Sequence, residues 1–199
     1  MAKKGDAIVK VLYASTALGG LMALMFAVLV VMRFTVFDFY HVPSESMAPA
    51  IPFGTHFLTW RNAGELKPGQ IVMHRTEGQV YAKRVVAVAG QTVEIKGQTV
   101  WIDGIAATYA DRGQEEVCTS QDTMEFAQRK TETLPSGVSY DILVGTGGTM
   151  DGAPYTVKEG EIYVLGDFRT NSMDSRVMGA VRTSDVIGVY WRTLFSACY

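Results

Sequence analysis

Two serines stand two positions apart in the stretch PSESMAP, residues 43–49. Ser44 and Ser46 have no histidine or cluster of acids beside them. A serine hydroxyl is a poor nucleophile until a base takes its proton. The stretch is therefore either a serine-containing turn or a nucleophile whose base lies elsewhere in the chain.

Histidine is the first base to consider, and the chain has three: His41, His56 and His74. None of them belongs to a Ser-His-Asp signature, and single histidines near strands are usually structural. A lysine can replace histidine only if its amine is neutral. That requires the pKa to fall by roughly 3.4 units from about 10.4 to reach half-neutrality at pH 7. Desolvation in an apolar site, helped by a nearby cation, is the physical route to such a shift.

Lys83 lies where such desolvation is expected, in QVYAKRVVAVA, residues 79–89. Strand alternation puts Lys83 on one face and Arg84 on the other, with apolar residues on both faces. One of these adjacent cations must therefore point into an apolar environment. Arginine does not usefully deprotonate, so Lys83 is the candidate base. A lysine at a sheet edge with its amine in solvent is the alternative.

A third polar stretch, GDFRTNSMDSR, covers residues 166–176 and follows an apolar segment. Read alone, it is a loop whose side chains hydrogen-bond their own backbone. It could equally supply a hydroxyl that orients a neutral lysine, with Asp–Arg pairs making the surroundings rigid.

The elements that must position these residues are mainly short strands. Apolar segments bounded by Gly, Pro and Asn predict strands at residues 55–60, 70–75, 79–89, 161–167 and 185–195. Residues 91–104 predict a tight hairpin with its turn at Lys96 and Gly97. Residues 104–160 lose the alternation and indicate a long, variable insertion with loops. The fold class expected is mainly β.

The segment before PSESMAP has a different character, because residues 11–32 contain no charge. As a helix they would span roughly 33 Å, enough for the hydrocarbon core of a bilayer. We expect an uncleaved transmembrane anchor, since no small-residue cleavage site ends the run. Lys3, Lys4 and Lys10 outweigh Asp6, so the positive-inside rule puts residues 1–10 in the cytoplasm and exports residues 33–199.

The charge of the chain argues against a nucleic-acid partner, and its two cysteines leave a disulfide open. The formal net charge is −2 although residues 1–10 are basic, so the remainder is acidic and no nucleic acid is expected as a partner. Cys118 and Cys198 are isolated and belong to no metal-binding motif. They could form a disulfide or remain two free thiols.

The stretches PSESMAP, YAKRVVAVAG and GDFRTNSMDSR, in this order after an N-terminal anchor, resemble the type I signal peptidase (leader peptidase) family. The resemblance covers most of residues 36–102 and 161–180. It implies an antiparallel β-sheet catalytic domain facing the membrane. The site residues that it implies are the nucleophile Ser46, the general base Lys83, the oxyanion donors Ser44 and Ser46, the lysine-orienting Ser172, and the supporting Asp167, Arg169, Asp174 and Arg176.

The function implied is a membrane-bound serine endopeptidase that removes N-terminal signal peptides from exported preproteins. Its substrates would carry small residues at the first and third positions before the cut. The resemblance implies no metal and no organic cofactor. It places the chain in the bacterial inner membrane, as a single-pass protein with the catalytic domain on the extracytoplasmic side.

The sequence also departs from the family pattern, at Ala50, Gln70, Ala89, Gln91 and Phe168. None of these positions carries a catalytic group. They favour a divergent member, such as a peptidase dedicated to the pilin precursor of a conjugation or secretion system. A membrane-anchored assembly protein on an inactive peptidase scaffold is the non-enzyme alternative. A soluble self-cleaving repressor with a Ser-Lys pair fits neither the anchor nor the charge.

Overall fold

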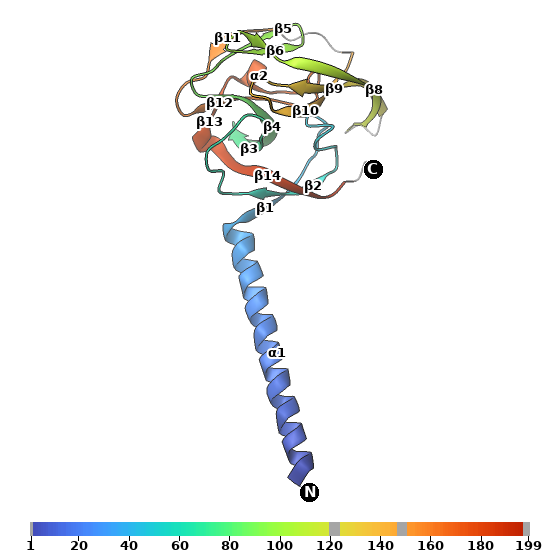
Figure 1. Cartoon of the computed structure of the whole chain (residues 1–199), viewed down its shortest axis with the longest axis vertical. Coiled ribbons are helices and arrows are strands. Elements are labelled where there is room, and N and C mark those ends of the chain that lie inside the picture. The colour runs from blue at the N-terminus through green and yellow to red at the C-terminus, as the bar shows by residue number, and fades with distance from the viewer. Residues whose placement is uncertain (1, 120–123, 147–150, 197–199) are drawn as a thin grey trace. The chain divides into compact units, whose positions relative to one another are not determined.

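The computed structural model describes residues 2–119, 124–146 and 151–196, without the side chains of residues 2–15, 17 and 34. The chain forms two compact units, Met1–Asp38 and Phe39–Tyr199. The first is built on one helix, α1 (Ala2–Thr35), and the second is built from strands (Figure 1).

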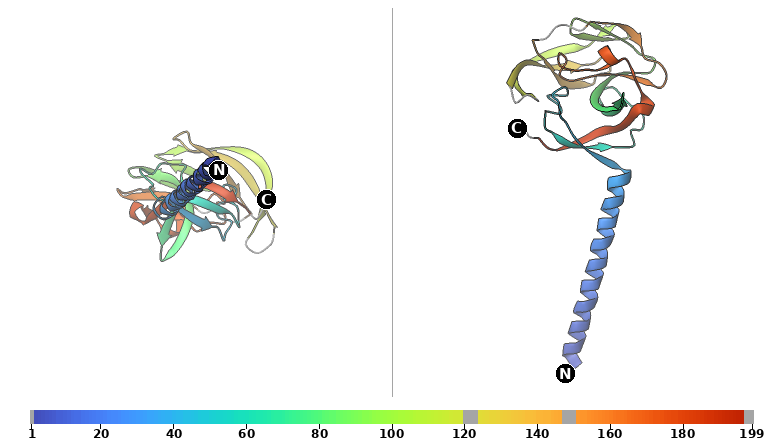
Figure 2. Two further views of the ribbon diagram at one scale, coloured as in Figure 1. Left: turned by 90° about the horizontal axis from the view of Figure 1, so that it is seen from below. Right: turned by 180° about the vertical axis from the view of Figure 1, so that it is seen from behind.

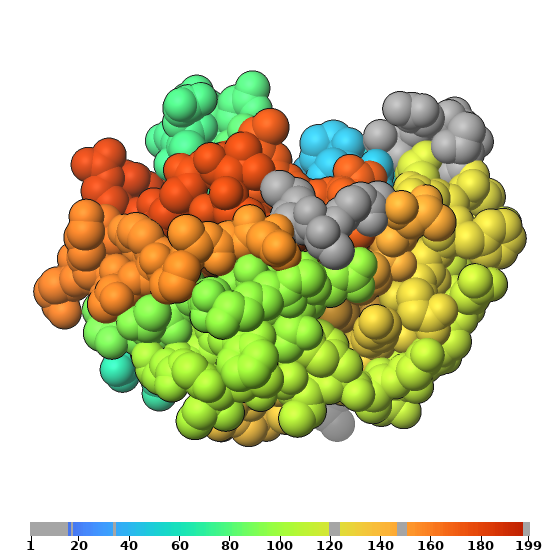
Figure 3. All heavy atoms as spheres, turned by 90° about the horizontal axis from the view of Figure 1, so that it is seen from above, coloured from blue at the N-terminus to red at the C-terminus, as the bar shows by residue number. Residues whose placement is uncertain are grey.

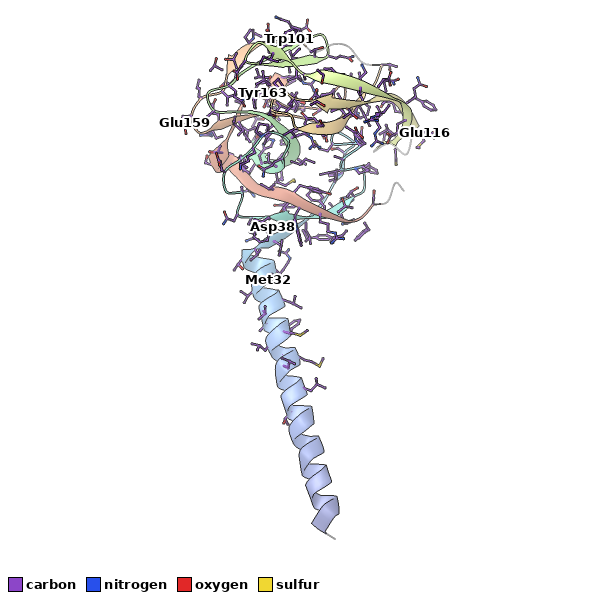
Figure 4. The ribbon with its side chains drawn as sticks, in the orientation of Figure 1. Met32, Asp38, Trp101, Glu116, Glu159 and Tyr163 are labelled. Carbon is purple, nitrogen blue, oxygen red and sulfur yellow. The ribbon has the colours of Figure 1, made fainter. Side chains whose placement is uncertain are left out.

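α1 contains the charge-free run, and its described part exposes apolar side chains such as Met32, which Figure 4 labels. Within the described part of the chain, no helix is long and apolar enough to cross a membrane. Residues 11–15 and 17 of the expected anchor have side chains outside that description. The predicted boundaries at residues 10 and 32 stay predictions.

The described strands form three sheets, in which β2 to β14 pair in antiparallel fashion. The largest sheet runs in the order β1 (Phe37–His41), β2 (His56–Trp60), β14 (Val186–Phe195), β3 (Ile71–Thr76), β4 (Gln79–Val88), β12 (Glu161–Leu165) and β13 (Val181–Arg182). The second contains β11 (Gly152–Thr156), β5 (Thr92–Lys96), β6 (Thr99–Ile102) and β7 (Ile105–Ala106). The third contains β10 (Ser139–Val144), β9 (Met124–Thr133) and β8 (Thr108–Cys118). One helical turn, α2 (Ser175–Met178), and a 3-10 turn (Thr183–Asp185) complete the described elements.

These elements confirm a mainly antiparallel β fold. The predicted hairpin is present as β5 and β6, and its last pair joins Lys96 to Thr99. The two-residue turn is therefore Gly97-Gln98, one position later than expected. Gly97 adopts a φ of 61°, the left-handed conformation that such turns require and that glycine adopts without strain.

The expectation of loops across residues 104–160 is wrong, because β7 to β11 fill most of this segment. β8 and β9 pair over nearly their full length. Most of β8 is exposed or half-buried on both faces, so it has no apolar side to produce alternation. Cys118, at the end of β8, is disulfide-bonded, while Cys198 lies outside the described residues.

The sheet that contains β5, β6 and β11 covers one end of the β unit. It lies at the end opposite β2 and β14 in Figure 1 and in the right-hand view of Figure 2. Figure 4 places Trp101, on β6, at that end, with Glu116 out on β8. Seen from above, β5 to β7 in green adjoin β11 in orange and β8 and β9 in yellow-green (Figure 3). The insertion is therefore a packed part of the unit.

Separate apolar clusters support the PSESMAP segment from two sides. Met47 and Phe57 belong to a buried cluster with residues of β3. Ala48 belongs to another, with Phe168 and with Leu143 and other residues of the insertion. Phe168, at a departure from the family pattern, is fully buried there. The insertion thus supplies the apolar surroundings that a phenylalanine needs at this position.

Replacing Phe168 by Asn should lower the free energy of unfolding by about 3 kcal/mol or more. The change removes buried apolar contacts and leaves an amide in an apolar cluster. Denaturant unfolding of the detergent-solubilised chain measures the effect. Phe126→Asn is the matched control, because Phe126 is 62% exposed and its loss should change stability by less than about 0.5 kcal/mol. Equal losses at both positions would contradict the role of the cluster.

Candidate active site

The PSESMAP segment forms tight turns that present Ser46. The backbone N–H of Ala48 donates to the carbonyl of Glu45 at 2.8 Å, and that of Ile51 donates to the carbonyl of Met47 at 2.8 Å. Met47 and Ile51 are buried, whereas Ser46 is half-buried. The apolar neighbours therefore hold the backbone while the serine hydroxyl stays accessible.

Lys83 of β4 reaches this hydroxyl. Its Nζ shares a hydrogen bond of 2.9 Å with Ser46 Oγ, and Ser44 Oγ lies 3.3 Å from Ser46 Oγ. Residues 46 and 83, which the sequence analysis paired as nucleophile and base, are thus in direct contact. A neutral amine at this distance can accept the proton of the serine hydroxyl.

The Lys83 amine is held away from water. The side chain is 2% exposed, and burial lowers its pKa from 10.5 to about 8. The carboxylates of Asp174 and Asp167 oppose this shift, and the Arg176 guanidinium reinforces it. A substantial fraction of the amine is therefore neutral near pH 8.

Both adjacent cations of β4 turn out to be buried. Arg84 donates from Nε to Asp167 Oδ1 at 2.7 Å, from Nη2 to Asp167 Oδ2 at 2.5 Å, and from Nη1 to the Gly69 carbonyl at 2.7 Å. Burial opposes the charge on Arg84, but Asp167 keeps its pKa raised. The arginine has a carboxylate partner and stays charged, whereas the lysine faces a serine hydroxyl.

Residues 166–176 are organised around Asp174. Asp174 Oδ2 accepts the Gly166 backbone N–H at 2.9 Å, and both carboxylate oxygens accept bonds from the Arg176 guanidinium. Asp174 also caps α2. The neighbouring Phe168 backbone N–H donates to the Ser46 carbonyl at 3.1 Å. This network ties the loop to the main chain of the PSESMAP segment.

Ser172 lies close to the same backbone. A Cβ placed on Gly166 would meet Ser172 Oγ at 2.1 Å and the Ser46 carbonyl oxygen at 2.7 Å, so this position accepts only glycine. Within the described residues, Ser172 Oγ is buried without a hydrogen-bond partner. The expected bond from Ser172 to the Lys83 amine is therefore not formed in this structure, and the lysine-orienting role of Ser172 stays a prediction.

Arg169 connects the loop to the insertion. It donates to both carboxylate oxygens of Glu132 on β9, at 2.5 and 2.6 Å, and to the Gly166 carbonyl at 3.1 Å. Glu132 is fully buried and also accepts from the hydroxyls of Tyr109 and Tyr140. The Arg169 charge keeps the pKa of Glu132 low despite burial, which favours protonation. Glu132 could not be recognised from the sequence, because a lone acid in a polar segment carries no sign of burial.

Two hollows adjoin the Ser46–Lys83 pair. One, of about 380 Å³, lies between residues 40–47 and 79–83 and includes Met73. The other, of about 320 Å³, includes Glu45, Asn171 and Met173. Ser44, Ser46 and Lys83 line both, so the Ser46 hydroxyl and the Lys83 amine lie where the two hollows meet.

The histidines take no part in the contact with Ser46. His74 is buried, its Nδ1 lies 3.0 Å from Thr76 Oγ1, and its ring stacks on Tyr81. Burial, with the nearby Lys83 charge, lowers the pKa of His74 to about 4. Across the residues whose placement is described, no three His, Cys, Asp or Glu side chains gather as a metal site.

Comparisons with known proteins agree on one class of protein. The model of the family described as signal peptidase, peptidase S26, matches residues 15–194. Signal peptidase I T of Bacillus subtilis is 31% identical over 176 residues, covering 83% of this chain and 79% of the relative. Signal peptidase I of Bacillus amyloliquefaciens is 30% identical, covering 81% and 76%. A crystal structure of a signal peptidase I from Enterococcus faecalis shares 24% identity, covers 63% of this chain and 97% of that chain, and has a TM-score of 0.37, too low for comparing positions.

An antiparallel β unit with a serine beside a buried lysine fits a peptidase, and the sequence matches are with peptidases. The chain belongs to the signal peptidase family, peptidase S26.

Replacing Glu132 by Gln should lower the free energy of unfolding by about 3 to 5 kcal/mol, because it leaves the Arg169 charge buried without a carboxylate. Thermal or denaturant unfolding measures the loss. Glu132→Gln combined with Arg169→Met should recover part of it, since no uncompensated charge remains. Asp185→Asn is the control: it breaks the exposed pair with Arg182 and should cost less than about 1 kcal/mol. A Glu132 effect no larger than the control would contradict this account.

Proposed function

We propose that this protein is a membrane-anchored serine endopeptidase that removes N-terminal signal peptides from exported preproteins, with Ser46 and Lys83 as its catalytic dyad. The observation that carries the proposal is the 2.9 Å contact between Ser46 Oγ and the buried Lys83 amine, whose pKa is lowered to about 8. Membership in the signal peptidase family supports the substrate class.

In this mechanism the neutral Lys83 amine takes the proton of Ser46 as its Oγ attacks the peptide carbonyl. The tetrahedral intermediate collapses as the lysine ammonium gives that proton to the leaving amine, and the peptide bond breaks. A water then repeats the sequence on the acyl-enzyme, with Lys83 taking its proton and returning it to Ser46 Oγ.

The oxyanion of each tetrahedral intermediate needs donors that are in place beforehand. We assign this role to the Ser46 backbone N–H and the Ser44 hydroxyl, which lies 3.3 Å from the nucleophilic oxygen. Ser172 is assigned to orient the lysine. Asp167, Arg169, Asp174 and Arg176 hold the loop that carries it.

The substrate would bind as an extended strand. Among the described strands, residues 79–83 of β4 pair only with β3, because pairing with β12 begins at Arg84. The free edge beside Lys83 can therefore pair with a peptide backbone. Alternate side chains of that peptide would face the hollow lined by Val42, Met73 and Ala82. This fits small residues at the first and third positions before the cut.

We assign residues 11–32 to the bilayer, with residues 1–10 in the cytoplasm and the β unit on the extracytoplasmic side of the bacterial inner membrane. The charge-free run and the basic residues before it support this assignment. Leu18, Leu29 and other apolar side chains of α1 are exposed, as a lipid-facing helix requires.

Ser46→Ala and Lys83→Met should each lower kcat/KM by at least about 1000-fold, because each removes a group that forms or breaks a bond. The assay is cleavage of a preprotein with alanine at the first and third positions before the cut, using detergent-solubilised full-length protein. Ser136→Ala and Lys67→Met are matched controls at exposed positions and should cleave normally. Normal cleavage by either dyad variant would reject the assignment.

The pH dependence of kcat/KM should follow the deprotonation of Lys83. Protonated Lys83 cannot accept the serine proton, so kcat/KM should rise through an inflection near the lysine pKa of about 8 and level off above it. At about pH 6, roughly 1% of the amine is neutral and activity should fall in proportion. An inflection near 4, where His74 titrates, would indicate a different base.

A further inference from the structure

The hollow that includes Asn171 contains a charged group that the mechanism above does not use. Glu45 lies between Ser44 and Ser46 and is half-buried. One of its carboxylate oxygens accepts a hydrogen bond of 2.8 Å from Asn171 Nδ2. The Asn171 backbone N–H in turn donates to the Phe168 carbonyl at 3.0 Å. The carboxylate is therefore held beside the nucleophile by the same loop that holds the backbone of Ser46.

The two hollows receive opposite sides of a bound peptide. Both include Ser46 and Lys83, so a chain whose reacting carbonyl lies at Ser46 must pass from one hollow into the other. Val42, Met73 and Ala82 give the first an apolar wall suited to the small residues before the cut. The residues after the cut then enter the second hollow, beside Glu45. This step rests on the proposed function.

The second hollow is negatively charged in the reactive state. Of the described residues that line it, Glu45 is the only acid and Lys83 the only base, the others being Ser, Gln, Tyr, Asn and Met. Because Lys83 must be neutral to act as the base, the carboxylate of Glu45 determines the charge that an incoming substrate meets. A basic side chain is attracted there, and an acidic one is repelled.

We infer that Glu45 determines specificity on the leaving-group side. It favours substrates with a lysine or arginine within the first two residues of the mature protein and discriminates against aspartate or glutamate there. Its position within the PSESMAP segment makes this preference a property of the turn that carries Ser46.

The test compares preproteins that are identical except for Ala, Lys or Glu at the first, and in a second set at the second, position after the cut. Wild-type protein should show a kcat/KM for the Lys substrate on the order of tenfold above that for the Glu substrate in at least one set. Glu45→Gln should bring this ratio below about twofold. Glu45→Lys should reverse it. Glu65→Gln, at an exposed acid that lines a different hollow, should keep the wild-type ratio.

The outcomes separate this inference from the proposed function. Cleavage of the Ala substrates with equal rates for Lys and Glu would overturn the inference and leave the peptidase assignment intact. Failure to cleave the Ala substrates would reject the peptidase assignment itself. Should the Glu45 variants fail to fold, wild-type protein still decides, because an electrostatic ratio must fall toward one between about 50 and 500 mM salt. A Lys-to-Glu ratio of kcat/KM that does not change with salt concentration would overturn the role of Glu45.

Discussion

The amine of Lys83 is buried against the hydroxyl of Ser46, and burial disfavours its charged form. A fall in pKa from 10.5 to about 8 corresponds to on the order of 3 kcal/mol of preference for the neutral amine relative to water. A neutral amine can serve as a base, but only if nothing nearby restores its charge. The carboxylates of Asp167 and Asp174 would do so if they were unpaired. Each is instead engaged by an arginine, Arg84 and Arg176 respectively.

These ion pairs also position the loop that faces the lysine. A buried pair stabilises little by itself, because both charges lose their hydration, but losing one partner is costly. Movement of the loop that separated the two partners of such a pair would therefore be strongly destabilising. Asp167, Arg169 and Asp174 each hold residues 166–176 through a different neighbour: β4, the insertion, and the Gly166 backbone together with α2. The hydrogen bond from the Phe168 backbone N–H to the Ser46 carbonyl fixes the PSESMAP segment to this loop.

The insertion has a larger part in the site than its polar sequence indicated. The Glu132 carboxylate pairs with the buried Arg169 guanidinium. Leu143 packs with Phe168 and with Ala48 of the PSESMAP segment. The departure from the family pattern at Phe168 has a physical explanation here, since the insertion provides an apolar cluster around it. A substitution in the insertion can therefore affect residues 166–176 through packing.

The sequence alone determined the elements and residues that rest on local pattern. Apolar alternation located the main strands, and the adjacent cations of an apolar strand made Lys83 a candidate base for Ser46. Tertiary structure decided what depends on partners distant in the chain. In the folded protein, Lys83 and Arg84 are both buried, and Glu132 pairs with Arg169. Most of residues 104–160 form strands, and Glu45 accepts a hydrogen bond from Asn171. Alternation reports whether a segment has one buried face, but it cannot report which distant group meets a polar side chain. The charge state and role of such a side chain are therefore properties of the fold.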